Sequence, residues 1–143
     1  MDIGGVYIVN FPHKGGNELY GQHYAVVLSS VSKDDKTLLV APITGKKNGK
    51  KYRGGITIDN RKYQTNPTYT HSFIYIRKIQ EIDKRKIIYL RKKQTDELGN
   101  IKLDKNGNEL LEKEYKKIFQ LDEIDFNLLR DKCKEVIKFN WNI

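Results

Sequence analysis

Three histidines and one threonine are the side chains of this chain that we select as candidates for acid–base chemistry and hydroxyl donation. The imidazole changes charge near neutral pH, so His23 and His71 are candidate proton carriers, and Thr44 is a candidate hydroxyl donor to a phosphate oxygen. His13 follows Pro12 and is more typical of a structural residue. The three histidines are too widely spaced to indicate a zinc site, and the sequence implies no metal and no cofactor.

Metal-free cleavage of RNA needs a base for the 2′-hydroxyl, a cation or donors for the crowded phosphorane, and an acid for the departing 5′-oxygen. His23 is a candidate base or phosphate clamp, and His71 is its candidate partner in a two-histidine arrangement. The alternative interpretation is local for each residue. His23 then makes a hydrogen bond at the start of a strand, Thr44 simply ends one, and His71 lies on the surface.

The candidate substrate-binding residues are basic side chains interleaved with tyrosines. Four lysines fall within the six residues 46–51, and further cations and aromatics lie around them. Phosphates pair with cations and splayed bases stack on rings, so this composition suits single-stranded RNA. A lysine-rich loop can equally be a solvated loop. The residues we select for binding are Lys46, Lys47, Arg53, Tyr24 and Arg77.

Composition and charge set the class of protein. The 143 residues are 38% hydrophobic and carry a net charge of +9, which favours a polyanionic partner without distinguishing RNA from DNA or an anionic membrane. One cysteine, Cys133, excludes an internal disulfide. Asp2 stands where a signal peptide needs positive charge, and the apolar stretch from Val6 to Phe11 is too short to span a membrane. We therefore expect a cytoplasmic protein that does not enter membranes.

The elements that must position these residues are mostly strands. Short apolar runs separated by turn residues predict a barrel or sandwich, and the run from Tyr24 to Leu28 is continuous, as in a strand buried on both faces. The predicted strands are 6–9, 24–28, 37–41, 56–58, 73–76 and 87–90.

The last third of the chain has a different pattern. Two turn signals flank 101–103, and Asn106-Gly107 predicts a protruding hairpin closed by a type I′ turn. From Asp122, a candidate N-cap, apolar residues recur at helical spacing and predict a helix that covers the barrel. Its apolar stripe comprises Phe126, Leu129, Cys133, Val136 and Ile137. We expect one domain: a barrel at about 4–92, a hairpin insertion at about 94–112 and a C-terminal helix at about 122–139.

Four blocks of sequence, in order and at conserved spacing, resemble the MazF/PemK (Kid) toxin family. The first is the strand from Gly4 to Phe11, and the second is the glycine-rich loop and strand from Gly16 to Ser29. The third is Val40-Ala41-Pro42-Ile43-Thr44, and the fourth is the segment from Ile79 to Arg85. The chain is more distantly similar to the ToxN/AbiQ group, which also has a threonine near the end of this strand and a lysine shortly after it, here Thr44 and Lys46.

The resemblance implies a mainly β fold, a twisted SH3-like barrel of the CcdB/MazF type with a covering C-terminal helix. It implies a metal-independent endoribonuclease toxin that leaves a cyclic phosphate and a 5′-hydroxyl, a cognate antitoxin of protein or RNA, and a homodimer. Thr44 takes the family's catalytic threonine position, His23 its arginine position and Tyr24 its proline position. Glu18 aligns with an acidic residue near the site and is a second candidate base.

The replacement of the arginine by His23 keeps two other functions open. Imidazole can lose a proton and guanidinium cannot, so the change either shifts the chemistry or marks a lost active site. In the second case the chain is a non-catalytic SH3-like module that binds RNA or a protein. A DNA-gyrase poison on the CcdB-like fold is disfavoured because the four blocks follow the RNA-cleaving branch.

Overall fold

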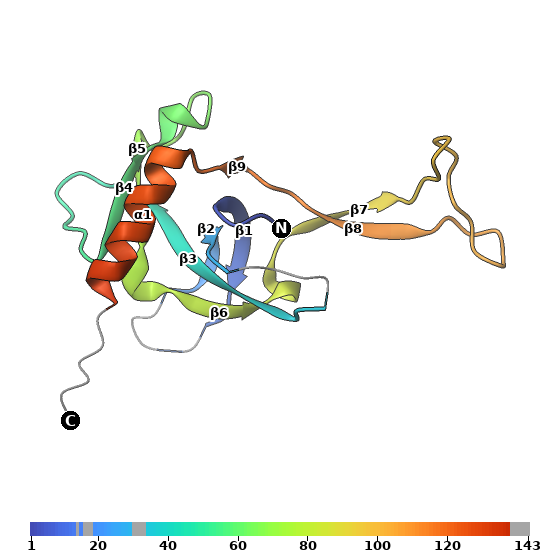
Figure 1. Cartoon of the computed structure of the whole chain (residues 1–143), viewed down its shortest axis with the longest axis horizontal. Helices are drawn as coiled ribbons and strands as arrows, with labels where there is room; N and C mark the ends of the chain where they lie inside the picture. The colour runs from blue at the N-terminus through green and yellow to red at the C-terminus, as the bar shows by residue number, and fades with distance from the viewer. Residues whose placement is uncertain (14, 16–18, 30–33, 138–143) are drawn as a thin grey trace.

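The computed structural model describes residues 1–13, 15, 19–29 and 34–137. A curled antiparallel sheet forms the body, one helix lies against it, and a two-stranded arm projects away (Figure 1). The strands are β1 Gly5–Phe11, β2 Gly21–Val27, β3 Thr37–Gly45, β4 Gly55–Asp59, β5 His71–Tyr75, β6 Gln80–Asp83, β7 Tyr89–Lys93, β8 Leu111–Tyr115 and β9 Phe119–Gln120. Three short 3₁₀ turns, η1 Asn60–Lys62, η2 Ile76–Lys78 and η3 Lys84–Lys86, precede the helix α1 Glu123–Val136.

The sheet curls because β3 changes partner along its length. In the strand order β4-β5-β3-β2-β1-β9, residues Ile43 to Gly45 of β3 pair with β5, whereas Thr37 to Val40 pair with β6. Pro42 lies where the partner changes, between the segments paired with β6 and β5, and pairs with Ala25 of β2 on its other side. The result is a half-barrel, which confirms the predicted mainly β, MazF-type fold with a C-terminal helix.

Both faces of the sheet are buried, and the side chains of each face belong to a separate hydrophobic cluster. One cluster joins Val26 and Ile74 to the helix residue Leu129, and the other joins Val27 and Val40 to Ile87, which forms a bridge to β1. The continuous apolar run of β2 serves both clusters, as its pattern predicts. Because both faces are packed, the sheet edges and loops are left to carry function.

Helix α1 begins at its predicted cap and covers one face of the sheet. Asp122 accepts a hydrogen bond from the Asp125 backbone N–H at 2.8 Å. Phe126, Leu129, Cys133 and Val136 pack against the core as predicted. Ile137 does not: it is the C-cap residue and 43% exposed. The predicted end of the helix at about 139 lies outside the described residues.

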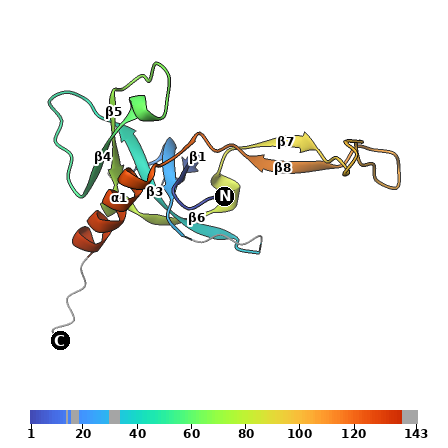
Figure 2. The ribbon, with the colours of Figure 1, turned by 45° about the horizontal axis from the view of Figure 1, so that its top comes forward.

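The arm is longer than the hairpin predicted at about 94–112. Its strands are β7 and β8, and the segment between them makes two further turns at the tip (Figures 1 and 2). The predicted type I′ turn at Asn106-Gly107 is wrong, because Gly107 has a positive φ of 79° and Asn106 does not. Asp104 closes this turn instead, accepting backbone hydrogen bonds from Asn106 and Asn108.

The positive charge is concentrated in the body. Residues 1–88 contain 15 Lys and Arg against seven Asp and Glu, whereas residues 89–115, which form the arm, contain six of each. A polyanion is therefore attracted to the half-barrel and not to the arm. In the part of the chain that the structure describes, no helix has the length and apolar character of a membrane span.

Candidate active site

His23 and Thr44 lie next to each other on adjacent strands. Tyr24 of β2 pairs with Ile43 of β3, and the same antiparallel register places His23 opposite Thr44. Both side chains line one hollow of about 250 Å³ at the rim of the half-barrel. The remaining described residues that line this hollow are Leu19, Tyr20, Lys50, Tyr75 and Lys78.

The His23 ring is held by a hydrogen bond that fixes its tautomer. Nε2 lies 3.0 Å from the backbone oxygen of Tyr20. A carbonyl oxygen only accepts, so Nε2 must carry the hydrogen, and in the neutral ring Nδ1 keeps a free lone pair. His23 thus makes the local hydrogen bond expected if its role is only structural. The same bond leaves Nδ1 able to accept a proton, so it is also compatible with a role as a base.

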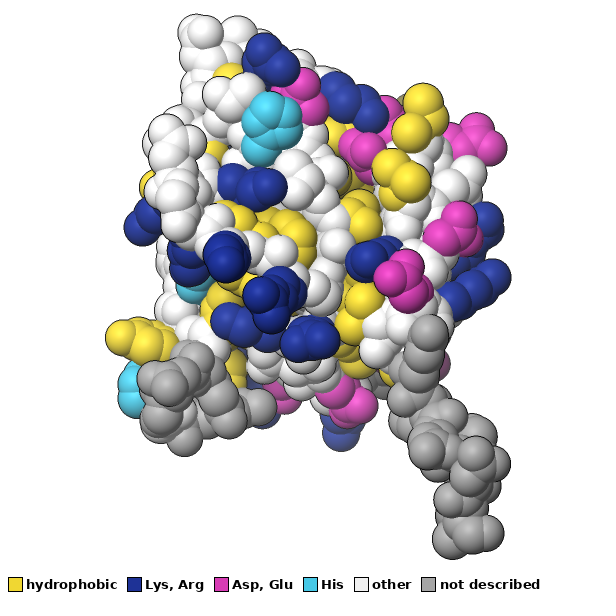
Figure 3. All heavy atoms as spheres, turned by 90° about the vertical axis from the view of Figure 1, so that its left-hand side faces the viewer, with side chains coloured by type: hydrophobic (Ala, Val, Ile, Leu, Met, Phe, Trp, Pro, Cys, Tyr) yellow, Lys and Arg dark blue, Asp and Glu magenta, His cyan; other side chains and the backbone are white. Residues whose placement is uncertain are grey.

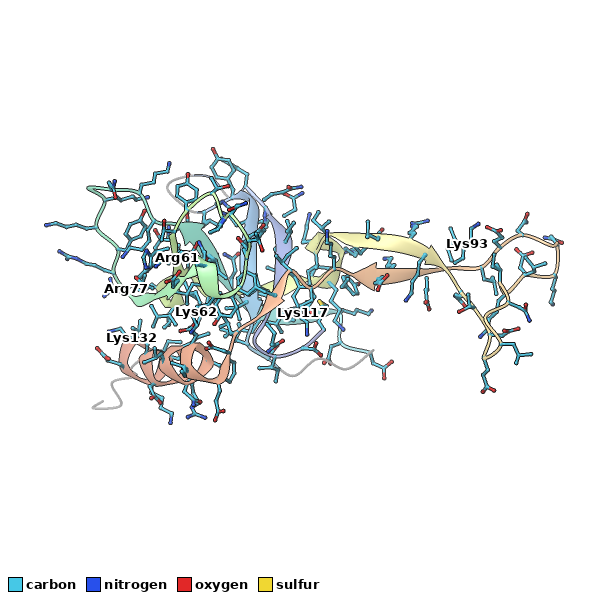
Figure 4. The ribbon with its side chains drawn as sticks, turned by 90° about the horizontal axis from the view of Figure 1, so that it is seen from above. Arg61, Lys62, Arg77, Lys93, Lys117 and Lys132 are labelled. Atoms are coloured by element: carbon cyan, nitrogen blue, oxygen red, sulfur yellow. The ribbon has the colours of Figure 1, made fainter. Side chains whose placement is uncertain are left out.

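The turn η2 decides which basic residue of the Arg77-Lys78 pair faces this hollow. Side chains three residues apart eclipse in a 3₁₀ turn, so Lys78 lies over the Tyr75 ring, with Nζ 4.5 Å from the ring centroid. Arg77 instead packs on Gly54 and is exposed at the end of the molecule opposite the arm (Figure 4). Burial raises the pKa of the Tyr75 phenol, which keeps it a hydrogen-bond donor.

The lysine-rich connection between β3 and β4 is anchored on aromatic rings. Lys46 Nζ donates to Thr57 Oγ1 at 3.1 Å, and Lys46 and Lys50 lie 5.4 and 5.5 Å from the Tyr52 ring centroid. Tyr52 in turn packs against Phe73 at 5.3 Å. On the side opposite the arm, Lys and Arg side chains gather around hydrophobic ones (Figure 3). Lys46 and Lys50 are therefore held near the Tyr52 ring, while Lys47, Lys50 and Lys51 remain exposed to solvent.

His71 lines a second hollow instead of joining His23. Its backbone oxygen accepts from the Lys46 N–H at 2.9 Å, and the residue lines a basic hollow of about 690 Å³. Strand spacing places the two histidine Cα atoms roughly 12 Å apart. This geometry does not favour the predicted two-histidine acid–base pair. The lysines of this second hollow are Lys46, Lys47 and Lys50.

Tyr24 lines a third hollow, of about 250 Å³, on the other side of Thr44. None of the described residues that line it is charged, unlike those of the two basic hollows. Its lining includes Gly45, Gln64, Tyr69 and Ser72. Thr44 therefore stands between a basic hollow and an uncharged one.

The remaining predicted site residues lie elsewhere. Glu18 falls outside the described residues, and Arg53 is exposed on the β3–β4 connection and lines none of these three hollows. The structure adds Lys50, Tyr75 and Lys78 to the hollow of His23. Lys50 belongs to the lysine-rich run and Lys78 follows Arg77 directly, so the sequence does show basic residues at both places. Only the geometry of η2 shows that Lys78, and not Arg77, lines the hollow.

Comparison with known proteins identifies the family. Residues 2–106, most of the half-barrel and part of the arm, match the family described as PemK-like, MazF-like toxin of type II toxin–antitoxin system. No curated protein matches the chain. The match spans well over half of the 143 residues, and the chain therefore belongs to the PemK-like, MazF-like family of type II toxins.

Proposed function

We propose that this toxin is an endoribonuclease that cleaves single-stranded RNA without a metal ion, leaving a cyclic phosphate and a 5′-hydroxyl. One observation carries the proposal: the hollow that holds His23 and Thr44 also holds Lys50 and Lys78. A proton acceptor, a hydroxyl donor and two cations thus converge on one place, as cleavage by the 2′-hydroxyl requires.

His23 is the base in this proposal. Its Nε2–H is engaged by the Tyr20 carbonyl, which leaves Nδ1 to accept the proton of the 2′-hydroxyl. The oxygen then attacks the adjacent phosphorus, and the bond to the 5′-oxygen breaks. The departing oxygen takes its proton from a donor of the same hollow, for which Lys78, held over Tyr75, is our candidate.

Thr44 and the lysines stabilise the charge that develops on the phosphorane. The Thr44 hydroxyl donates to a non-bridging oxygen, and Lys50 supplies fixed positive charge. Among the described residues that line the hollow there is no carboxylate, and the two ammonium groups repel a divalent cation. The lining therefore favours a mechanism in which lysines, instead of a metal ion, stabilise the negative charge of the phosphorane.

Single-stranded RNA is the substrate that this surface suits. The second hollow, with Lys46, Lys47 and His71, continues the basic lining beyond Thr44, and Tyr69 lies within it. Phosphates can follow the lysines while bases stack on exposed rings. We further propose that the toxin acts in the cytoplasm as a homodimer, and that its antitoxin is a protein or RNA that covers these hollows.

A second function, a non-catalytic RNA-binding module, is favoured by one feature. His23 occupies the position of the family's arginine, so the basic hollows remain while a fixed guanidinium is lost. Binding alone would then explain the surface. The two functions differ in whether RNA is cut.

The test is incubation of purified protein with a long single-stranded RNA in EDTA, followed by analysis of the fragment ends. Discrete fragments with 5′-hydroxyl and cyclic phosphate ends support the proposal. RNA that is retarded on a gel but stays intact supports the binding module. Cleavage that disappears in EDTA contradicts the metal-free mechanism.

A further inference from the structure

The third hollow differs from the two basic hollows in chemistry. It lies directly beside Thr44, has a volume of about 250 Å³, and is lined by aromatic, amide, hydroxyl and aliphatic side chains. Among the residues that the structure describes, no lysine or arginine lines it, although residues 1–88 hold 15 of them. An uncharged hollow in so basic a surface is a poor site for a phosphate and is suited to a neutral, planar group.

Two tyrosines give the hollow its aromatic walls. Tyr24 and Tyr69 are 36% and 39% exposed, so their rings remain open to a ligand. Tyr69 lies directly on Gly45, where an added Cβ would clash with the ring. Gly45 thus lets the ring approach β3 closely, next to Thr44. Tyr69 also lines the basic hollow of His71, so it lies between a basic surface and an uncharged one.

The polar side chains of the hollow include one amide that holds the wall and one amide that is free to bind a ligand. Asn60 is buried and uses its amide hydrogens on the Tyr69 carbonyl at 2.8 Å and on Ser72 Oγ at 2.7 Å, so it holds the wall in place. The Gln64 side chain makes no hydrogen bond to another described residue, while its backbone N–H donates to Asn60. Gln64 therefore offers both a donor and an acceptor to a ligand.

We propose that this hollow binds one nucleobase of the RNA, stacked on Tyr69 and recognised by the Gln64 amide, and so sets where the toxin cuts. The inference rests on the proposed function, because it places the base beside the phosphate held at Thr44. An amide that presents a donor and an acceptor side by side pairs with the matching edge of a base, with adenine as its commonest partner. Stacking supplies affinity, and Gln64 supplies selectivity.

The test uses binding rather than cleavage, so that it does not depend on catalysis. A short single-stranded RNA is selected for binding to the wild-type protein and made with 2′-fluoro riboses, which lack the attacking hydroxyl. Each base is then removed in turn by an abasic substitution. We expect one position at which base removal weakens binding to the wild type by about 10-fold, the size of one lost stacking contact.

The variants identify the hollow as the cause. Tyr69→Ala should weaken binding of the intact RNA. In this variant, removing the base at the sensitive position should weaken binding little further, because the ring on which that base stacks is already absent. The control Tyr89→Ala removes an arm tyrosine that lies against Tyr115, and it should keep the wild-type pattern. Gln64→Glu replaces the amide donor with an acceptor and should change the preferred base at the same position.

Two negative results are distinguishable. If wild type binds RNA but Tyr69→Ala keeps the full abasic penalty at every position, the base-binding inference is wrong and the proposed function is untouched. If no RNA binds to the wild type, both fall. An unchanged base preference in Gln64→Glu refutes the role of Gln64 as the reader.

Discussion

Substitution of Tyr63 by Phe should destabilise the protein by detaching helix α1 from the sheet. The Tyr63 hydroxyl donates to the Asp125 carboxylate and accepts from the Asp122 backbone N–H at 3.1 Å, so it joins η1 to the first turn of the helix. Burial and the hydrogen bond to Asp125 raise the pKa of the phenol, which stays protonated and keeps donating. Asp125 is 6% exposed and is left partly unsatisfied when this donor is removed.

The expected loss follows from the two hydrogen bonds. A bond to a charged acceptor is worth about 1.5–3 kcal/mol and a neutral one about 1 kcal/mol, which gives a decrease of about 2.5–4 kcal/mol in the free energy of unfolding. Partial exposure of Tyr63 favours the lower end. Two contacts survive: Phe keeps the stacking on Phe119, whose centroid lies 4.7 Å away, and Lys62 still pairs with Asp125 at 3.1 Å.

Urea unfolding at neutral pH, followed by far-ultraviolet circular dichroism, measures this loss. The matched control is Tyr115→Phe on the arm, whose hydroxyl makes no hydrogen bond to another described residue, and which should change the free energy by less than about 0.5 kcal/mol. Equal effects of the two substitutions would refute the reasoning. A small effect of Tyr63→Phe alone would show that the hydroxyl contributes no more than a solvated one.

Three further predictions concern binding, pH and the arm. Lys78→Met should reduce the slope of log K against log salt for single-stranded RNA by about one, since one phosphate contact is lost; an unchanged slope places the phosphate elsewhere. Hydrogen bonds from Arg61 lower the pKa of Asp59 from 3.8 to about 2, so this carboxylate stabilises the fold above pH 3.8 and its contribution is lost as the pH falls toward 2. Between pH 3.8 and 2, Asp59→Asn should therefore lose less stability than the wild type. If the urea unfolding midpoints of the two proteins decrease equally over this interval, Asp59 does not gain stability from Arg61. Replacing 94–110 with a two-residue turn removes four acidic and two basic residues and should therefore not weaken RNA binding; a weakened interaction would show that the arm contacts RNA.

The sequence predicts most of the sheet because most of its strands are short apolar runs that can be recognised in the local sequence. The continuous run in β2 indicates burial on both faces, and Ala25, Val26 and Val27 are all buried. The sequence does not predict strand β6, because Ile82 is its only buried residue and its pairing with the first half of β3 defines it. Such pairing depends on residues distant in sequence and leaves no local pattern.

The candidate site was predictable in part for the same reason. His23 lies near the start of β2 and Thr44 near the end of β3, and the register of the two strands places them side by side. The resemblance to a known family indicates both residues. Lys78 depends on how η2 turns the chain, which the order of Arg77 and Lys78 does not reveal. The wall formed by Gln64 and Tyr69 comes from the connection between β4 and β5, whose path has no periodic signal.

The central claim is that RNA is cut in the hollow of His23 and Thr44. The most direct measurement is the rate of single-stranded RNA cleavage in EDTA by wild type, His23→Gln and Thr44→Val, with binding measured in parallel and Thr95→Val on the arm as the control. The account predicts that both site variants bind RNA but cut it at least about 100-fold more slowly, while the control retains the wild-type rate. Wild-type rates in His23→Gln and Thr44→Val, or intact RNA after incubation with the wild type, would contradict it.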